Sequence, residues 1–137
     1  MQQISPKIEG LFQQAAANKL LGLTLISCSA DLVEIAMPLK PAYLQEVGVV
    51  HGGLISALAD TTAVYLLYPY LDSNQAMTSI EFKINFLHPA VLEKGDLHAR
   101  AKTVKKGRKI AVCDVEVLQA EKLIAKGLFT YLIFDRT

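Results

Sequence analysis

Residues 49–71, VVHGGLISALADTTAVYLLYPYL, form the most apolar long stretch of the chain. The stretch predicts one helix from about Gly52 to Tyr68, because Pro69 cannot continue it. The helix is hydrophobic nearly all round, as in a helix that other elements enclose. Two features break this character: a glycine pair at the start and a lone Asp60 near the centre. The stretch therefore predicts a buried core helix that carries one unexplained carboxylate.

The same stretch is nearly long enough to cross a membrane, since Leu54–Leu71 spans 18 residues. An aspartate near the centre of a spanning helix, however, costs about 2.5–3.5 kcal/mol to insert. No other segment of the chain is comparably apolar. A buried core helix is the better interpretation, and no membrane span is expected.

Six strand-like segments flank this helix, two before it and four after it. Turn residues separate segments that are alternately or continuously apolar. The predicted ranges are Leu23–Ser29, Leu32–Leu39, Thr78–Leu87, Asp96–Lys105, Lys109–Gln119 and Leu123–Phe134. A short amphipathic helix from Pro6 to about Asn18, capped by Ser5, precedes them. This order predicts an α+β fold in which an antiparallel sheet wraps around the long helix.

Two of these segments carry more specific predictions. Segment 78–87 alternates cleanly, with one apolar face made by Ile80, Phe82, Ile84 and Phe86. Segment 123–134 is apolar on both faces, which is typical of a central or doubly covered strand.

The composition indicates one domain that associates with another copy of itself and not with nucleic acid or an anionic membrane. At 137 residues the chain is most simply a single domain. Lys and Arg number 14 against 13 Asp and Glu, so the net charge of +1 gives no reason to expect nucleic acid or an anionic membrane. Hydrophobic residues make up 52% of the chain, which predicts apolar surface buried against another copy of it.

The cysteines and the amino terminus bear on the cellular compartment. Cys28 and Cys113 lie far apart in strand-like runs and are expected to be core residues, not a disulfide. The amino-terminal MQQISPKIEG lacks the basic and apolar regions of a signal peptide. We therefore expect a cytoplasmic location.

The glycine pair and Asp60 together indicate acyl chemistry. Free N–H groups at a helix start, with the positive end of the helix dipole, polarise a carbonyl oxygen. Gly52 and Gly53 leave room for such an oxygen, and Asp60 two turns later is placed to act as base or nucleophile. A structural explanation stays open, in which the glycines make a tight junction and Asp60 pairs with a basic residue, the backbone or water.

His51 is the natural third member of such a site. It lies about 13 Å from Asp60 along one helix, which is too far for direct contact within a chain. Other enzyme classes lack their signatures, since the chain has no G-x-S-x-G nucleophile elbow, P-loop or dinucleotide fingerprint. His51, His88 and His98 are scattered without zinc-ligand spacing, so no metal is expected.

A basic cluster lies around the predicted turn between segments 96–105 and 109–119. Its members are Lys102, Lys105, Lys106, Arg108 and Lys109. One interpretation is a solvated hairpin tip. The other is a contact for the phosphates of a nucleotide-bearing substrate such as coenzyme A, made by Lys105, Lys106 and Arg108.

Four segments, in order along the chain, carry a family resemblance: VGVVHGGLISALADTTA, SIEFKINFLHPA, KKGRKIAVCDVEV and KLIAKGLFTYLI. The first contains His-Gly-Gly with an aspartate eight residues after the first glycine, and the second fits S-x-[DE]-x-x-[IV]-x-[FY]-x-x-P-A. From about Leu21 to Phe134 the chain resembles the hotdog-fold acyl-CoA thioesterases of the phenylacetate-pathway and thioesterase-superfamily-member-2 type. The resemblance implies one hotdog domain over residues 1–137, with a curved six-stranded antiparallel sheet around the long helix.

The resemblance also implies a homodimer or homotetramer with active sites at the dimer interface. Asp60 matches the family's catalytic carboxylate, and Gly52 matches the residue whose N–H polarises the thioester carbonyl. Ser79 falls where the family places a hydroxyl that holds the attacking water. Gln45 falls where this branch usually has Asn, and an amide of either kind can donate and accept.

Three functions are compatible with these residues. The favoured one is hydrolysis of an acyl-CoA or aryl-CoA thioester to free acid and CoA, with Asp60 activating water. His51 then has a supporting role and Gly53 contacts the substrate. No cofactor is expected, because coenzyme A is part of the substrate. The alternatives are an acyl-CoA-binding module without turnover and a hotdog dehydratase acting on a 3-hydroxyacyl thioester. Dehydratases of that kind typically rely on a catalytic histidine, so the position of Asp60 favours hydrolysis.

Overall fold

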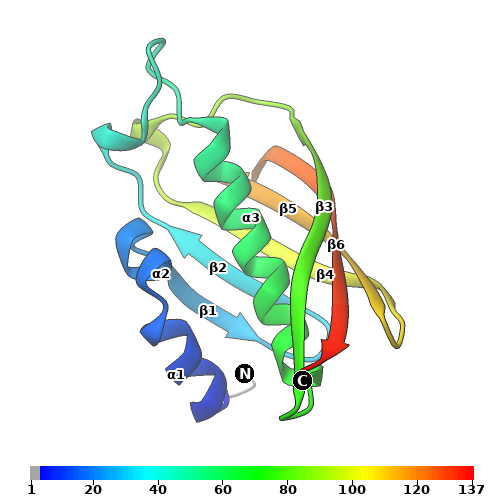
Figure 1. Cartoon of the computed structure of the whole chain (residues 1–137). Helices are drawn as coiled ribbons and strands as arrows, with labels where there is room; N and C mark the ends of the chain where they lie inside the picture. Colours follow the sequence, from blue (N-terminus) through cyan, green and yellow to red (C-terminus); the bar gives the residue numbers. More distant parts are fainter. Residues whose placement is uncertain (1–3) are drawn as a thin grey trace.

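A long helix lies across one face of a curved antiparallel sheet in the computed structural model, which describes residues 4–137 (Figure 1). The helices are α1 (Pro6–Gln14), α2 (Ala16–Leu21) and α3 (Gly52–Leu67), with short 3-10 helices η1 (Pro41–Tyr43), η2 (Tyr68–Tyr70) and η3 (Leu92–Lys94). The strands are β1 (Thr24–Cys28), β2 (Val33–Met37), β3 (Gln75–Phe86), β4 (Leu97–Lys106), β5 (Ile110–Gln119) and β6 (Lys122–Asp135). The predicted α+β hotdog architecture is confirmed. The first three residues of the segment that argues against a signal peptide lie outside the described range.

The six strands form one sheet in the order β1-β2-β4-β5-β6-β3, and every pairing is antiparallel. β6 lies between β5 and β3, so the prediction of a central strand is confirmed. The strand is not covered on both faces, because Leu128 and Phe134 remain exposed on it. β3 pairs with β6 on one side only and forms an edge of the sheet.

α3 is apolar because the sheet encloses most of its surface. Its buried face packs chiefly on β2, β4 and β5. The buried residues of this face are Ile55, Leu58, Ala59, Thr62, Ala63, Tyr65, Leu66 and Leu67. A second stripe, which includes three polar residues, is only half-buried and consists of Ser56, Ala57, Asp60, Thr61 and Val64. Asp60 thus lies on the stripe that the chain's own sheet leaves uncovered. Within residues 4–137 no helix has the length and apolar character that a membrane crossing requires.

The amino-terminal helix is shorter than predicted. Ser5 caps it as expected, accepting a hydrogen bond from the Ile8 N–H at 3.2 Å. The backbone turns to an extended conformation at Ala15, and α2 follows as a separate helix. The reason is Asn18, whose buried amide donates to the Phe12 carbonyl and to the Tyr65 hydroxyl. The Phe12 carbonyl would otherwise bond within a continuing helix.

The clean alternation predicted for the third strand is interrupted by a β-bulge. Ser79 pairs with Tyr131 and Glu81 pairs with Thr130, so Ile80 has no register partner in β6. Tyr131 and Phe129 are two residues apart and share the buried face of β6, and Phe82 pairs with Phe129. Ser79 therefore faces the same way as Phe82, toward α3, whereas uninterrupted alternation would have placed it on the outer face.

The two cysteines agree with the expectation of core residues. Both are free, Cys113 is buried on β5, and Cys28 is half-buried at the end of β1. Burial raises the pKa of the Cys113 thiol to about 12.

The tight packing of β3 against Gly127 on β6 predicts which glycine the sheet requires. A side chain at Gly127 on β6 would collide with the Lys83 carbonyl of β3 and come within 3.0 Å of the Ile84 Cα. We expect Gly127→Ala to lower the free energy of unfolding by about 3 kcal/mol, because backbone atoms must move. Urea denaturation measures this loss. Gly10→Ala is the matched control, since a side chain there meets nothing within 4 Å, and it should be neutral or slightly stabilising. Equal stability of the two variants would contradict the packing of β3 on Gly127.

Candidate active site

The first turn of α3 leaves one backbone donor free. A helix start has four N–H groups that the helix itself cannot satisfy. Three of them are bonded here: His51 N–H to the Tyr43 carbonyl at 2.9 Å, Gly53 N–H to His51 Nδ1 at 2.9 Å, and Leu54 N–H to the His51 carbonyl at 3.0 Å. Gly52 N–H has no acceptor among residues 4–137. The helix start therefore presents a single unsatisfied N–H, at the positive end of the dipole.

His51 acts as the N-cap of α3. Its backbone is extended, and its side chain accepts the Gly53 N–H. Because Nδ1 is the acceptor, the ring proton of the neutral form is on Nε2. This hydrogen bond occupies the Gly53 N–H, so the structure gives His51 and Gly53 the role of shaping the helix start.

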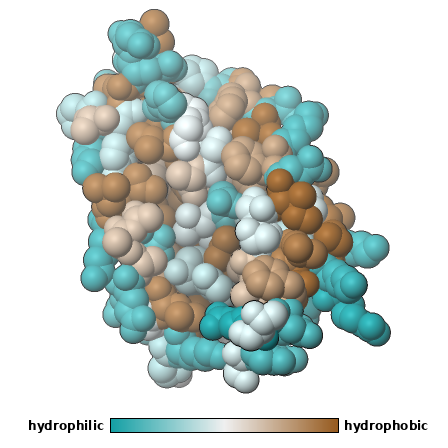
Figure 2. Space-filling view, in the orientation of Figure 1, coloured by the Kyte–Doolittle hydropathy of each residue, from teal (hydrophilic) through white to brown (hydrophobic). Residues whose placement is uncertain are grey.

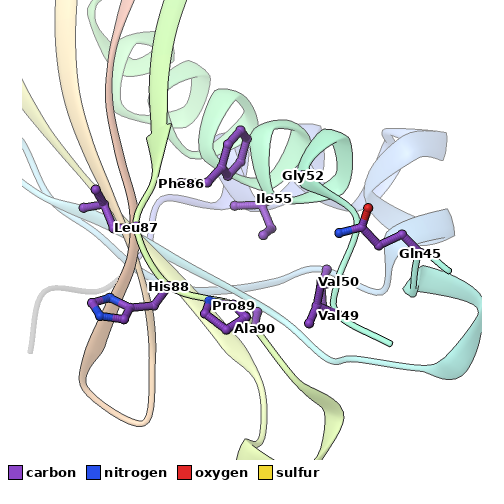
Figure 3. Close-up of a pocket in the computed structure, with 10 residues that line it drawn as sticks. All are labelled: Gln45, Val49, Val50, Gly52, Ile55, Phe86, Leu87, His88, Pro89 and Ala90. Atoms are coloured by element: carbon purple, nitrogen blue, oxygen red, sulfur yellow. The ribbon is translucent and has the colours of Figure 1, made fainter. Parts of the chain in front are cut away.

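A pocket of about 340 Å³ opens beside the free donor (Figure 3). Gly52 lies at its edge, and the side chain of Gln45 extends toward the same end of the helix. Its walls are mostly apolar and include Val49, Val50, Ile55, Leu87, Pro89 and Ala90. The Phe86 ring lies so close that a side chain at position 52 would come within 3.1 Å of it. Glycine at this position lets the ring close over the helix start.

Gln45 owes its position to a tight loop. Its N–H donates to the Val49 carbonyl at 2.9 Å, and its carbonyl accepts from Gly48 N–H at 3.0 Å. Gly48 has a φ of +80°, which is a conformation that favours glycine. The loop is joined to the core by the Val50 N–H, which donates to the Ala90 carbonyl. The amide of Gln45 is exposed and free to bond a water molecule or ligand.

Asp60 lies near the middle of α3, in a second group of polar residues. The hydroxyl of Tyr131 on β6 donates to Asp60 Oδ1 and also lies 3.1 Å from the Asp60 carbonyl oxygen. Ser79 on β3 is the register partner of Tyr131. Asp60 Oδ2 has no hydrogen-bond partner among the described residues, and no basic side chain there forms an ion pair with it. Of the structural explanations left open above, pairing with a cation does not apply.

The two groups are apart within one chain. Gly52 and Asp60 are eight residues apart on the same helix, which corresponds to about 12 Å along its axis. Gln45 lies with Gly52, whereas Ser79 lies with Asp60. One chain therefore carries two half-sites on α3, neither of which combines the donor with the carboxylate.

The basic cluster lies far from the Gly52 half-site of the same chain. The β4–β5 hairpin projects near the carboxyl-terminal end of α3 (Figure 1). The ammonium of Lys106 lies 3.4 Å from the ring centroid of Tyr70, in the 3-10 turn that follows α3. Lys102, Lys105, Arg108 and Lys109 are exposed. The hairpin thus lies at the opposite end of the helix from Gly52.

Among residues 4–137 there is no group of three or more His, Cys, Asp or Glu side chains that could hold a metal ion. His88 borders the pocket beside Gly52, but its Nδ1 lies 3.0 Å from the Leu123 carbonyl. Tyr131 is the residue near Asp60 that sequence reasoning missed. It is 71 positions away, and its segment GLFTYLIF is almost entirely apolar, so a tyrosine there is unremarkable.

Comparison with known proteins identifies the family. Residues 47–125, more than half of the chain, match the family model described as the thioesterase superfamily. A Saccharolobus solfataricus protein with a provisional esterase name is 30% identical over 92% of this chain and 89% of its own length. The range 47–125 matched by the family model contains the glycine pair, Asp60 and Ser79.

Solved structures resemble the whole chain. A thioesterase of Haemophilus influenzae superposes with a TM-score of 0.85 at 26% identity, covering 98% of this chain and 93% of the other. A thioesterase family protein of Silicibacter pomeroyi also gives 0.85, at 27% identity, with 94% and 96% covered. The Escherichia coli PaaI protein, from the phenylacetic acid degradation operon, shares the fold at 24% identity and a TM-score of 0.84, with 94% and 91% covered.

The N-cap of α3 makes a prediction about stability. His51→Ala leaves the Gly53 N–H without its acceptor, so the free energy of unfolding should fall by about 1 kcal/mol in urea denaturation. His51→Asn should recover most of this loss, because asparagine is a preferred N-cap. His88→Ala, at a histidine that borders the pocket beside Gly52, controls for the removal of an imidazole. A loss in His51→Asn as large as in His51→Ala would argue against the capping role.

Proposed function

The chain belongs to the thioesterase superfamily, and we propose that it hydrolyses an acyl-CoA or aryl-CoA thioester to the free acid and CoA. The observation that carries this proposal is the pair of groups on α3: one unsatisfied N–H at Gly52 and one carboxylate at Asp60. Ester-type hydrolysis needs both of these, a donor for the developing oxyanion and a base for water.

In the proposed mechanism Gly52 N–H donates to the thioester carbonyl oxygen and stabilises the negative charge that develops there. Asp60 accepts a proton from a water molecule as the water oxygen attacks the carbonyl carbon. The tetrahedral intermediate then collapses and the carbon–sulfur bond breaks, so that CoA leaves with the electron pair on sulfur. The sulfur takes up the proton held by Asp60, which gives the CoA thiol and restores the carboxylate. Gln45 and Ser79 orient the water. The reaction uses only water and groups of the protein, so no resident cofactor is required.

The donor and the carboxylate act together when two copies of the chain form one site. β3 is a twelve-residue edge strand without a single buried residue, and Ile80, Phe82 and Phe86 on it are 53%, 45% and 51% exposed. Figure 2 shows apolar side chains gathered over this edge and its neighbour β6. An exposed edge of this kind pairs readily with a second strand. The proposed homodimer, which can pair further into a tetramer, covers this edge and the half-buried stripe of α3.

Two-fold symmetry would also place each half-site of one copy beside the complementary half-site of the other. Two β3 edges that pair antiparallel place the two α3 helices antiparallel to each other. The start of α3 in one chain then lies beside the middle of α3 in the other. Gly52 and Gln45 of one copy would thus meet Asp60 and Ser79 of the second copy. The same symmetry brings the hairpin of the second copy toward Gly52 of the first.

The remaining features fit a CoA thioester. The apolar pocket beside Gly52 suits an aryl or aliphatic acyl group. Lys105, Lys106 and Arg108 on the exposed hairpin provide point charges for the CoA phosphates. Two free cysteines are in keeping with a reducing compartment, and we propose a cytoplasmic location.

A mixed-dimer experiment tests the shared site. Asp60→Asn removes the base, and Gly52→Pro removes the donor while leaving a residue that suits the first helical position. His51 before it is already extended, as a residue preceding proline must be. Each variant alone should lose about 10²- to 10³-fold in kcat. A mixed dimer isolated through two different tags should recover about half of the parent rate, because one of its two sites is intact.

Gly52→Ala is the matched control, since it adds a side chain against Phe86 but keeps the N–H. It should lose much less activity than Gly52→Pro. A mixed dimer as inactive as both variants would place the site within single chains. Full activity of Asp60→Asn, folded and dimeric, would rule out the mechanism.

The hairpin predicts how substrate binding depends on phosphate. Replacing Lys105, Lys106 and Arg108 together by alanine should raise KM for an acyl-CoA about 5- to 30-fold at low salt, and the effect should fade as ionic strength rises. The matching acyl-N-acetylcysteamine thioester carries no phosphate, so its KM should stay constant. Lys19→Ala, an exposed lysine on α2, controls for loss of surface charge. An equal change with both substrates would show that the hairpin does not bind phosphate.

A further inference from the structure

Tyr131 is a core residue whose only polar atom is directed at the proposed catalytic base. It is 1% exposed and is among the largest fully buried side chains of the molecule. Its hydroxyl bonds both to Asp60 Oδ1 and to the Asp60 carbonyl oxygen, 71 positions away in sequence. A buried hydroxyl needs a hydrogen-bond partner, but a backbone carbonyl alone would satisfy that need. The contact with the carboxylate is therefore an additional feature.

The hydroxyl is a permanent donor. Burial, together with the neighbouring Asp60 carboxylate, raises the pKa of Tyr131 well above its ordinary value. The other titratable group that acts on this hydroxyl is the Cys113 thiol on β5, whose own pKa is raised to about 12 by burial, so it stays uncharged. Tyr131 thus keeps its proton across the working range of pH and neither donates it away nor serves as a base.

The effect on Asp60 is to make its two oxygens unequal. Oδ1 is occupied by the tyrosine, and Oδ2 has no partner among the described residues. A neutral donor fixes the orientation of the carboxylate without cancelling its charge, unlike a lysine or arginine. Ser79, the register partner of Tyr131, lies on the next strand beside this pair. Asp60 Oδ2 is then the oxygen left to bond a water molecule, on the half-buried stripe of α3 that the proposed dimer covers.

We infer that Tyr131 is a positioning residue for the catalytic carboxylate: it holds Asp60 Oδ1 so that Oδ2 alone takes the proton from water. This inference rests on the proposed thioester hydrolysis. It assigns to the buried strand β6 a part in catalysis that neither a motif nor a pocket indicates. A tyrosine with a purely structural role would donate its hydrogen bond to the backbone carbonyl alone. Its replacement by phenylalanine would leave kcat and KM unchanged.

Tyr131→Phe removes one oxygen and keeps the ring, so it tests the role directly. We expect kcat to fall on the order of 10- to 100-fold with KM changed less than about twofold, because substrate contacts stay intact while the base loses its orientation. In the Asp60→Asn background the same substitution should have little further effect on kcat.

The control is Tyr65→Phe. Tyr65 is also buried, lies on α3 itself, and accepts a hydrogen bond from Asn18 away from Asp60. It should cost stability in urea denaturation without lowering kcat. If Tyr131→Phe behaves in the same way, the positioning role is wrong while the proposed function stands, provided that Asp60→Asn is inactive. A parent protein that turns over no aryl-, short-chain or long-chain acyl-CoA overturns the proposed function and the role of Tyr131 with it.

Discussion

The burial of one apolar helix against the concave face of the sheet is the constraint on which the rest of the structure depends. The sheet encloses the face of α3 that carries Leu58, Ala63 and Leu66, and this accounts for most of the core. What the sheet cannot enclose is the opposite stripe, which carries Asp60. Gly52 lies at the start of the same helix, and Ser79 lies on the edge strand β3. The helix is thus both the centre of the core and the support of the site, which fixes the positions of Gly52 and Asp60 rigidly.

The same constraint makes a single chain incomplete. A straight helix separates two residues by a fixed distance, so Gly52 and Asp60 cannot approach each other however the loops move. Tyr131 connects the uncovered stripe to the edge strand β3, because it bonds to Asp60 and is the register partner of Ser79. A second copy that covers both the stripe and the edge would supply the missing half-site. Pairing with a second copy would therefore explain both the high apolar content of the chain and the separation of the catalytic groups within it. The surface that must be buried for stability is the surface on which the proposed chemistry occurs.

The sequence predicts what depends on local spacing. The helix, the six strands and the residues Gly52 and Asp60 follow from periodicity, glycine placement and one polar exception in an apolar run. The bulge at Ile80 could not be predicted, because an extra residue in one strand is defined only by the register of its neighbour. That bulge decides that Ser79 faces α3. Tyr131 was hidden for a related reason: its role depends on a pairing between elements far apart in the chain, and nothing in the run around it distinguishes its hydroxyl from that of a packed core tyrosine.

At the start of α3, hydrogen bonds to the neighbouring N–H groups leave the Gly52 N–H as the donor available to a substrate. His51 takes up the Gly53 N–H with its ring and the Leu54 N–H with its carbonyl, and Tyr43 takes up the N–H of His51 itself. Of these N–H groups, only that of Gly52 is left without an acceptor among residues 4–137. If the cap were absent, several N–H groups would compete for an incoming oxygen and its position would be less defined. At the other half-site Tyr131 does the same for Asp60 by occupying one of two oxygens. In both places hydrogen bonds within the fold occupy the competing atoms and leave one available, the Gly52 N–H at the helix start and Oδ2 at Asp60. The reaction that we propose requires one donor and one base at a fixed distance from each other.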